Sequence, residues 1–464
     1  MSERKSIQVP QSEIDAQRAY MQSVKRLNDN QTKYHIVTLG CQMNVRDSQT
    51  ISGMLDEMGC VAASVREDAD IILYNTCCVR ENAENRALGN VIWLKELKKD
   101  NPNLKICVGG CMMQEQGVAD RLKRQYPFID MIFGTHNLYR FPELLFRMLT
   151  EGHPVVEVMD IDGTIAEGLP VRRANGFQGY ISIMQGCNNY CSYCIVPYVR
   201  GRERSRLESD VLDEAKQLID DGVQEVTLLG QNVNSYDGGG DAFARLLYKL
   251  DALGAQRIRF MTSHPKDLSD ELIAAYTQLP HLARHLHLPV QAGNNRILTE
   301  MNRHYNREQY LRLVEKMRKI APDVGITSDI IVGFPGETDA EFDETMSLVE
   351  QVRFDAAFTF IFSPRTGTKA ADMPDGISAQ TKSERIERLI QCQQQISYEI
   401  LKDQVGKEER ILVEAVSTRD EMQVCGKTSR SHMVNFPGNK SLIGQYVTVG
   451  IQSAGRNTLR GQLI

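Results

Sequence analysis

Short apolar runs alternate with helix-spaced segments along the first third of the chain. Each run is rich in β-branched residues, which favour strands, and each is followed by a stretch with the apolar spacing of a helix. Strands that alternate with helices are typical of a parallel sheet. We therefore predict a parallel α/β domain, flavodoxin- or Rossmann-like, over residues 34–149. The runs are YHIVTLG, ADIILYNT and LKICVGG.

A second series of apolar runs, again separated by helical segments, fills residues 179–401. Its length exceeds that of an ordinary open sheet and predicts a partial (β/α)6 barrel, whose active site would lie at the carboxyl ends of its strands. Residues 150–178 contain several Gly and Pro and are expected to form a linker. The runs are GYISIMQ, EVTLLG, RIRFMTS, RHLHLPV, GITSDIIVG and DAAFTFIFS.

The two ends of the chain differ from these repeats. Residues 1–33 form a polar extension without the apolar run of a secretory signal. From residue 402, short alternating runs punctuated by Gly and Pro predict a small antiparallel β-barrel of the OB type. Residues 402–464 hold nine Lys or Arg against six Asp or Glu. Small barrels of this charge often bind RNA, although many solvated β-modules are equally basic.

Length, charge and cysteine content limit the kinds of protein that this chain can be. The chain has 464 residues, which suggests about three domains, and its net charge of −6 means that any nucleic-acid contact is local. No stretch approaches the roughly 18 apolar residues of a membrane helix, so we expect a cytoplasmic protein without a membrane partner. Disulfides are rare in a reducing cytosol, so the 11 cysteines are expected to bind metal, do chemistry or pack in the core.

Cys187, Cys191 and Cys194 form a C-x3-C-x2-C motif after the first run of the second series. A 4Fe–4S cluster normally takes four cysteine thiolates, so three close thiolates leave one iron open to an outside ligand. A small molecule with an amine and a carboxylate would chelate that iron. The alternative is a zinc site completed by a distant histidine or a fourth cysteine, but zinc ribbons usually contain two separated C-x2-C pairs. The spacing therefore favours an iron–sulfur cluster.

Cys41, Cys77 and Cys111 each follow one of the first three runs. Parallel strands end at one edge of their sheet, so these thiols are predicted to meet there. Cys78 should point away from Cys77 on an extended chain, and the position of Cys77 directly after Asn75–Thr76 makes it the favoured member. A purely structural role as core cysteines stays open. The remaining cysteines are predicted to be structural: Cys60, Cys107, Cys392 and Cys425.

Motifs that occur in order from about residue 34 resemble the methylthiotransferases of the radical S-adenosylmethionine (SAM) superfamily. The branch that acts on N6-dimethylallyladenosine in tRNA is the most similar, and the tail resembles a TRAM domain. The motifs are TLGCQMN, NTCCVR, GGCMMQ, GCNNYCSYCIVPYVRGRERSR, LLGQNVNSY, HLPVQAGNN and SDIIVGFPGET.

The resemblance implies two 4Fe–4S clusters. The C-x3-C-x2-C cysteines would hold the cluster that binds and cleaves SAM, while Cys41, Cys77 and Cys111 would hold an auxiliary cluster that carries the sulfur to be delivered. One SAM would methylate this sulfur, and a second would provide the radical that removes hydrogen from C2 of the modified adenosine-37 in the tRNA anticodon stem-loop. A C2–H bond is neither acidic nor electrophilic, so acid–base catalysis does not open it and a radical is needed.

Other candidate residues follow from the same resemblance. Gln231 ends the second barrel strand, where the superfamily places groups that hold the methionyl amine of SAM. Gln291, Gly333 and Gly336 lie at later strand ends and are candidates for the adenosyl site, although simple loop geometry explains them equally well. Four arginines beside the cysteine motif are candidate contacts to tRNA phosphates or else part of a solvated loop: Arg200, Arg202, Arg204 and Arg206.

We also expect a flavodoxin or ferredoxin as electron donor, and a monomer. The nearest alternative is a sibling methylthiotransferase that acts on threonylcarbamoyladenosine-37 of tRNA or on an aspartate of a ribosomal protein. A remote alternative is a non-catalytic metal- or RNA-binding module, for which so large a barrel with an open cysteine triad would be excessive. Metal content and visible absorbance separate the enzyme from the module.

Overall fold

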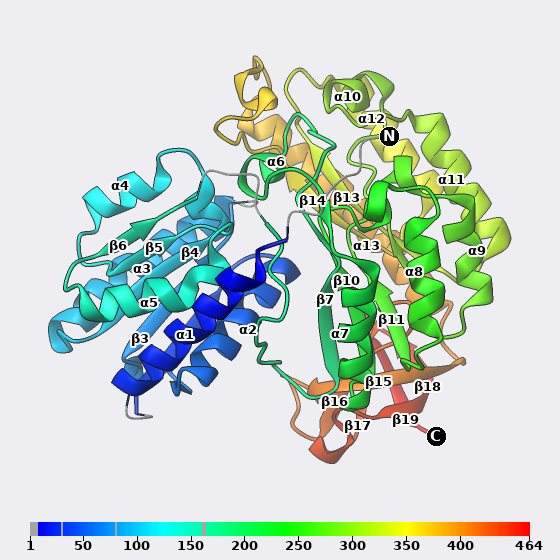
Figure 1. Cartoon of the computed structure of the whole chain (residues 1–464). Coiled ribbons are helices and arrows are strands. Elements are labelled where there is room, and N and C mark those ends of the chain that lie inside the picture. Colours follow the sequence, from blue (N-terminus) through cyan, green and yellow to red (C-terminus); the bar gives the residue numbers. More distant parts are fainter. Residues whose placement is uncertain (1–7, 29–30, 79–80, 160–163) are drawn as a thin grey trace.

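The computed structural model describes residues 8–28, 31–78, 81–159 and 164–464, with residues 81–88 as backbone only. The start of the predicted N-terminal extension, the end of the NTCCVR motif and the middle of the predicted linker lie outside these residues. An α/β domain lies beside a central βα barrel, and a small β-barrel lies at the base of the central one (Figure 1). The predicted fold class is confirmed.

The N-terminal domain is built on a six-stranded parallel sheet. Its strands are Lys33–Thr38 (β1), Val61–Ala62 (β2), Ile71–Thr76 (β3), Lys105–Gly110 (β4), Met131–Phe133 (β5) and Val155–Glu157 (β6), in the order β2-β1-β3-β4-β5-β6. Its helices are Gln11–Leu27 (α1), Gln42–Glu57 (α2), Glu81–Asp100 (α3), Val118–Gln125 (α4) and Phe141–Thr150 (α5). Residues of α1, α2 and α5, such as Met54, pack on one face, and residues of α3 and α4, such as Leu94, pack on the other. Because β1, β3 and β4 are adjacent, their carboxyl ends lie side by side.

The sequence predicted the strands β1, β3 and β4 but not β2 and β5, and two further elements lie where it predicted none. Helix α1 lies within the predicted polar extension, and its Ile14, Met21 and Val24 are buried. Its Gln17 donates to Glu143 of α5 at 3.2 Å. Strand β6 lies within the predicted linker and pairs in parallel with β5. One segment is mostly polar and the other is short. Their buried apolar residues can therefore be recognised only once the elements on which they pack are known.

The central domain is an open barrel of parallel strands. They are Gln178–Ser182 (β7), Glu225–Leu229 (β10), Arg257–Phe260 (β11), His285–His287 (β12), Gly325–Val332 (β13) and Ala356–Ile361 (β14). They form the groups β11-β10-β7 and β12-β13-β14, which meet where Ile258 pairs with Leu282 just before β12. The outer helices are Glu208–Asp220 (α7), Ala242–Asp251 (α8), Asp270–Gln278 (α9), Asn295–Glu300 (α10), Arg307–Ile320 (α11), Asp339–Val352 (α12) and Ala379–Lys402 (α13). Every predicted barrel strand is present.

The C-terminal domain is a closed barrel with the strand order β15-β16-β17-β19-β18. The strands are Glu408–Val416 (β15), Gln423–Lys427 (β16), Met433–Pro437 (β17), Tyr446–Ala454 (β18) and Leu459–Leu463 (β19). All neighbouring pairs are antiparallel except β17 and β19. This barrel lies against the amino ends of β10 and β11 (Figure 1), opposite to the end at which the C-x3-C-x2-C motif leaves β7.

Candidate active site

Three cysteines of the N-terminal domain lie at the carboxyl ends of adjacent strands. Cys41 lies between β1 and α2, Cys77 follows β3, and Cys111 begins the 3-10 turn after β4. We call these three the auxiliary triad. A Cβ added to Gly40 would lie 2.6 Å from Cβ of Cys77, which shows how closely the ends of β1 and β3 approach. The strand order thus gathers thiols that are distant in sequence.

The glycines before Cys41 and Cys111 have backbone conformations that other residues rarely adopt. The angle φ is +130° at Gly40 and +102° at Gly110. A Cβ on Gly110 would also lie 2.4 Å from the carbonyl oxygen of Thr76. Glycine therefore allows the sharp turn at each strand end and sets the direction in which the thiol leaves the sheet.

Cys77 and Cys78 leave β3 in different directions, as predicted for neighbours on an extended chain. Cys77 faces the Gly40 segment, whereas Cys78 lies against Cys111 and hydrogen-bonds to its sulfur. Both thiols are buried. The hydrogen bond from Cys78 lowers the pKa of Cys111, while burial opposes this shift. The choice of Cys77 as the cluster ligand stays a prediction.

A buried arginine from the barrel domain reaches this group. Nε of Arg200 lies 3.1 Å from Sγ of Cys111, and Nη2 of Arg200 donates to Asp47 at 2.6 Å. Burial alone would lower the pKa of Arg200, but Asp47, Cys111 and Cys41 raise it well above its ordinary value. The guanidinium therefore stays charged. Sequence reasoning missed this role because the partners of Arg200 lie far away in the chain.

The second cysteine group, Cys187, Cys191 and Cys194, lies in the loop after β7, and we call it the SAM triad. Main-chain bonds hold this loop, including one of 3.2 Å from the amide of Cys187 to the carbonyl oxygen of Gly201. Burial raises the pKa of Cys187 to about 11 and that of Cys194 to about 12. Such thiols keep their protons near neutral pH, so binding a metal here would release protons.

Arg303 contacts the SAM triad as Arg200 contacts the auxiliary triad. Its Nη1 donates to Sγ of Cys191 at 3.3 Å. Its other donors bond to the hydroxyl of Tyr305 at 3.0 Å and to the carbonyl oxygen of Pro289 at 2.9 Å. The side chain is buried. No motif in the sequence marked Arg303 as a neighbour of the cysteines.

Both triads suit an iron–sulfur cluster. In the part of the chain that the structure describes, no three His, Cys, Asp or Glu side chains close around a single metal ion. A 4Fe–4S cluster needs a wider arrangement, because each thiolate binds a different iron. A buried guanidinium beside each triad offsets the negative charge that thiolate ligands bring. The donor chemistry therefore fits the cluster.

Unpaired polar atoms lie at the carboxyl ends of β10 and β11. Oε1 of Gln231, Oδ1 of Asn232, Oγ of Ser263 and Nε2 of His264 are buried without a hydrogen-bond partner among the described residues. Buried polar groups are nearly always paired, so these atoms favour a bound polar ligand at this end of the barrel. Burial lowers the pKa of His264, and its imidazole is therefore neutral.

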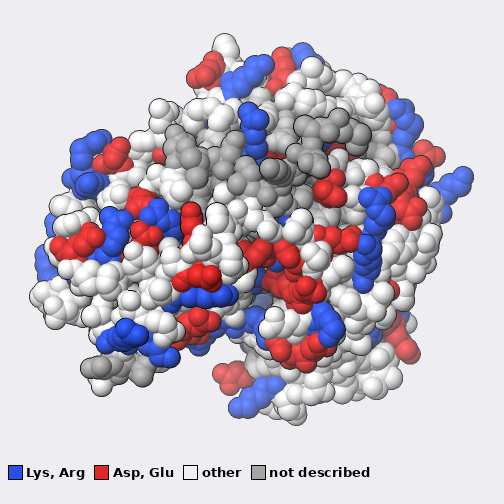
Figure 2. All heavy atoms as spheres, in the orientation of Figure 1, with Lys and Arg blue, Asp and Glu red and all other residues white. Residues whose placement is uncertain are grey.

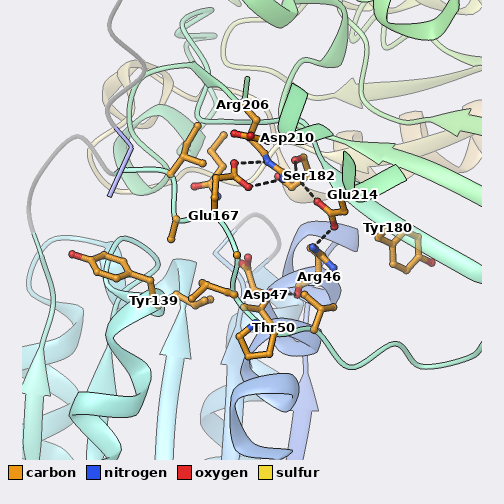
Figure 3. Close-up of a pocket in the computed structure, with 18 of the residues that line it drawn as sticks. Arg46, Asp47, Thr50, Tyr139, Glu167, Tyr180, Ser182, Arg206, Asp210 and Glu214 are labelled. Atoms are coloured by element: carbon orange, nitrogen blue, oxygen red, sulfur yellow. Dashed lines mark hydrogen bonds and ion pairs between the residues drawn. The ribbon is translucent and has the colours of Figure 1, made fainter. Parts of the chain in front are cut away.

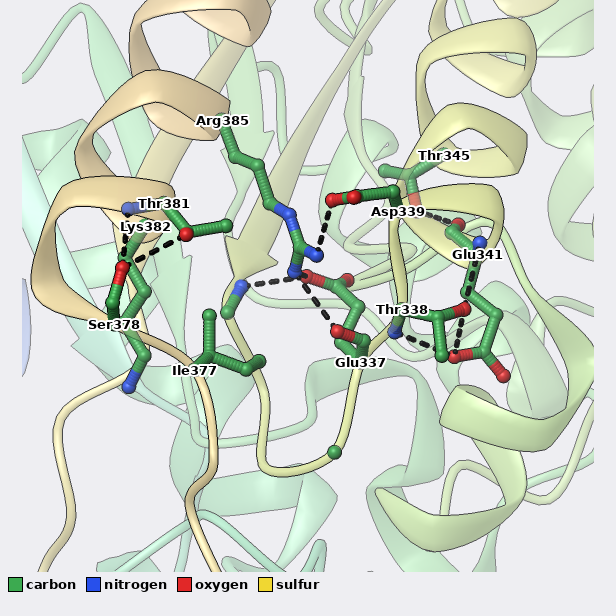
Figure 4. Close-up of polar contacts among 12 residues, drawn as sticks. Glu337, Thr338, Asp339, Glu341, Thr345, Ile377, Ser378, Thr381, Lys382 and Arg385 are labelled. Carbon is green, nitrogen blue, oxygen red and sulfur yellow. Dashed lines mark hydrogen bonds and ion pairs between the residues drawn. The ribbon is translucent and has the colours of Figure 1, made fainter.

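The remaining candidates for SAM binding lie in loops with left-handed backbone. The angle φ is +73° at Gln291, +69° at Gly333 and +72° at Gly336. The amide of Gly333 donates to Glu337 at 2.7 Å, and Arg385 of α13 holds the same carboxylate at 3.0 Å (Figure 4). The loop after β13 is therefore shaped by an ion pair from the last barrel helix, and its contact with SAM stays a prediction.

The four arginines beside the SAM triad have different surroundings. Arg200 is buried, and Arg206 forms ion pairs of 2.6 and 2.5 Å with a glutamate of the linker and one of α7. Arg204 is partly buried and donates to the carbonyl oxygen of Arg202 at 2.7 Å, while Arg202 is exposed. Figure 2 shows acidic and basic side chains interspersed over one face of the molecule. Of the four arginines, Arg202 is the exposed one, and an RNA contact by this segment stays a prediction.

A cavity of about 630 Å³ lies between α2, the linker and the β7–α7 unit (Figure 3). Its walls carry charges of both signs, and Arg46 and Arg206 share the carboxylate of Glu214. Arg200 lines this cavity, whereas Cys111 does not. Arg200 thus lies between the cavity and the auxiliary triad.

Three family models match the chain, one in each domain. The Radical SAM superfamily model matches residues 181–349 and the TRAM domain model matches residues 402–464. The model of the uncharacterized protein family UPF0004 matches residues 33–134. These ranges fall on the central barrel, the small barrel and the α/β domain.

Relatives that match the whole chain decide its family. The tRNA-2-methylthio-N(6)-dimethylallyladenosine synthase of Thermoanaerobacter sp. (strain X514) is 49% identical and covers 99% of this chain and 98% of its own length. The chain belongs to the tRNA-2-methylthio-N(6)-dimethylallyladenosine synthase family. Synthases of the same name from Alkaliphilus oremlandii (strain OhILAs) and Acetivibrio thermocellus are 47% and 46% identical; both cover 100% of this chain, and 100% and 98% of their own lengths. The resemblance found in the motifs is confirmed.

A similar fold also occurs among solved structures. The radical SAM methyltransferase TsrM from Kitasatospora setae, with cobalamin and a 4Fe–4S cluster bound, has a TM-score of 0.54 and is 15% identical, over 74% of this chain and 77% of that chain. At this identity the likeness concerns the fold alone. Across the described ranges, no helix is long and apolar enough to cross a membrane.

Proposed function

We propose that this enzyme is a cytoplasmic radical SAM methylthiotransferase that converts N6-dimethylallyladenosine-37 of tRNA into its 2-methylthio derivative. The observation that carries the proposal is the identity of nearly half the residues, over the full length, with relatives named for this product. The C-x3-C-x2-C motif at the end of β7 and the cysteines at the ends of β1, β3 and β4 support it.

Each triad is proposed to hold one 4Fe–4S cluster, the SAM triad for SAM and the auxiliary triad for the sulfur that is delivered. When bound, the clusters and SAM supply a radical, a methyl donor and a sulfur carrier. The side chains of this protein bind and orient these groups. The unpaired atoms of Gln231, Ser263 and His264 are suited to hold SAM at the barrel end.

Exposed aromatic rings beside the SAM triad support an RNA substrate. Tyr190 and Tyr198 are 41% and 52% exposed, and their ring centroids are 6.1 Å apart. Exposed aromatic rings stack on unpaired bases, and a neighbouring arginine binds phosphate. We propose that these rings and Arg202 contact the anticodon loop, while the C-terminal barrel contacts more distant RNA. A flavodoxin or ferredoxin is the proposed reductant, and the enzyme is expected to be monomeric.

Nucleoside mass spectrometry tests the proposed substrate. tRNA from a strain that lacks the gene should lose the 2-methylthio-N6-dimethylallyl nucleoside. The wild-type gene should restore it, and Cys191→Ala, expressed at the same level, should not. If the strain instead lost the 2-methylthio form of threonylcarbamoyladenosine, or a methylthio group on a ribosomal aspartate, the enzyme would be one of the siblings.

A further inference from the structure

A buried arginine that follows the SAM triad in the sequence contacts the auxiliary triad. Arg303 belongs to the same domain as Cys191, the cysteine that it contacts. Arg200 does not share a domain with its cysteine. It follows closely on Cys194 in the barrel domain, yet it contacts Cys111 of the N-terminal domain at 3.1 Å.

The segment that leads from the SAM triad to this arginine is fixed in the N-terminal domain. It contains the short helix Val196–Val199 (α6). Ile195 and Val199 are buried in the same apolar cluster as Cys111. The hydroxyl of Thr135 also donates to the carbonyl oxygen of Val199 at 3.0 Å. Packing therefore holds the arginine at the sheet edge that carries the auxiliary triad.

The guanidinium of Arg200 bonds to two groups at once. Nε faces Cys111, while Nη2 donates to Asp47, whose side chain is 12% exposed. Asp47 lies on α2, the helix that begins directly after Cys41. A lysine offers one compact ammonium group and does not reproduce this fork.

We propose that Arg200 is a positioning residue that holds Cys111 for the auxiliary cluster and sets how readily that cluster is reduced. The inference rests on the proposed second cluster. A cationic hydrogen bond to a ligand sulfur stabilises the more negative, reduced state and so raises the reduction potential. The carboxylate of Asp47 offsets part of this charge and opposes the effect.

A redox titration followed by electron paramagnetic resonance tests this role. The parent protein is the full-length chain with the SAM triad replaced by alanine and its remaining cluster reconstituted. Arg200→Met should shift the midpoint potential to more negative values, and Arg200→Lys should shift it less. Asp47→Asn should shift it to more positive values, because the guanidinium charge is then unopposed. Arg18→Met, which removes an exposed arginine of α1 in the same domain, is the control and should leave the potential unchanged.

Iron analysis distinguishes a failure of the proposed auxiliary cluster from a failure of the proposed role of Arg200. If the parent protein binds no iron, the proposal of a second cluster is wrong, and the role inferred for Arg200 is wrong with it. A parent with about four irons whose Arg200→Met variant titrates at the parent potential would overturn the role of Arg200 alone. If Arg200→Met fails to fold because Asp47 is left unpaired, the Asp47→Asn/Arg200→Met double variant replaces it. The double variant should titrate below Asp47→Asn, and equal potentials would overturn the inference.

Discussion

The carboxylate of Glu225 lies 2.7 Å from Nε of Arg259, and both side chains are buried beneath the C-terminal barrel. Arg259 also donates to the carbonyl oxygen of Thr428 and to the hydroxyl of Ser431, at 2.7 Å each. Burial alone would raise the pKa of Glu225, but Arg259 and its neighbour Arg257 lower it, so the carboxylate is ionised. A buried ion pair therefore fixes the small barrel to the base of the central one.

Arg259→Met should destabilise this junction. The substitution leaves a buried carboxylate and main-chain acceptors without their donor, which costs about 3–5 kcal/mol in comparable buried pairs. Urea unfolding measures the change. Glu225→Gln/Arg259→Met should recover part of the loss, and Arg18→Met, which breaks an exposed pair, should cost less than about 1 kcal/mol. Equal losses for Arg259→Met and Arg18→Met would contradict the account.

The adjacent cysteines after β3 provide a matched pair for testing the auxiliary ligand. Cys77→Ser should bind about four irons fewer than wild type, because a four-iron cluster loses one of its three protein ligands. Cys78→Ser should keep its iron, since in this account Cys78 donates a hydrogen bond to Cys111 and is not itself a ligand. Iron and sulfide analysis after anaerobic reconstitution measures both. The reverse result would make Cys78 the ligand.

His285 should make the fold sensitive to acid. Burial, and then Arg259 nearby, lower its pKa from 6.5 to about 3. Between these values the unfolded chain binds a proton that the folded chain does not, so stability is present above pH 6.5 and falls as the pH drops towards 3. His285→Gln removes this contribution of the imidazole to the pH dependence of stability. The glutamine keeps a hydrogen-bond partner for Thr327, to which the imidazole bonds at 2.9 Å.

Chemical denaturation at two pH values measures the effect of His285→Gln. The loss of unfolding free energy between about pH 7 and about pH 5 should be smaller in the variant by about 2 kcal/mol. His153→Gln, at an exposed position, serves as the control. A pH dependence identical to that of wild type in His285→Gln would show that another group causes the acid sensitivity.

Gly53 and Gly89 should respond oppositely to alanine. A Cβ on Gly53 of α2 would lie 2.5 Å from the main chain of Pro170 in the linker, whereas no atom of the described side chains or of other elements lies within 4 Å of a Cβ on Gly89 of α3. Overpacking should cost Gly53→Ala about 1–3 kcal/mol and loosen the linker. Gly89→Ala should gain roughly 0.5–1 kcal/mol from helix propensity. Thermal unfolding and limited proteolysis of the linker measure both, and stabilisation by both substitutions would contradict the packing.

The strands and the cysteine positions could be predicted from the sequence because the signals are local. The predicted strands are short apolar runs, most of them with β-branched residues, and Cys41, Cys77 and Cys111 come directly after three of them, whereas β2, β5 and β6 were not predicted. Because alternating strands and helices form a parallel sheet, the ends of these strands, and hence the thiols, lie at the same edge. The sheet order β1-β3-β4 makes them immediate neighbours.

The roles of the arginines could not be predicted in this way. Arg200, Arg202, Arg204 and Arg206 alternate in one segment and have the same side chain, yet two face inward and Arg202 faces solvent. Their partners come from α2, the linker and α7, so only the folded chain distinguishes them. Helix α1 was missed for a similar reason, since its buried side chains become a stripe only against α5.

The most direct test of the central claim is an iron count on the anaerobically reconstituted protein and on its two triple-alanine variants. Wild type should hold about eight irons, and loss of either triad should leave about four. SAM should change the electron paramagnetic resonance signal only when Cys187, Cys191 and Cys194 are intact. A wild-type protein with about four irons, unchanged when Cys41, Cys77 and Cys111 are replaced, would contradict the claim of two clusters.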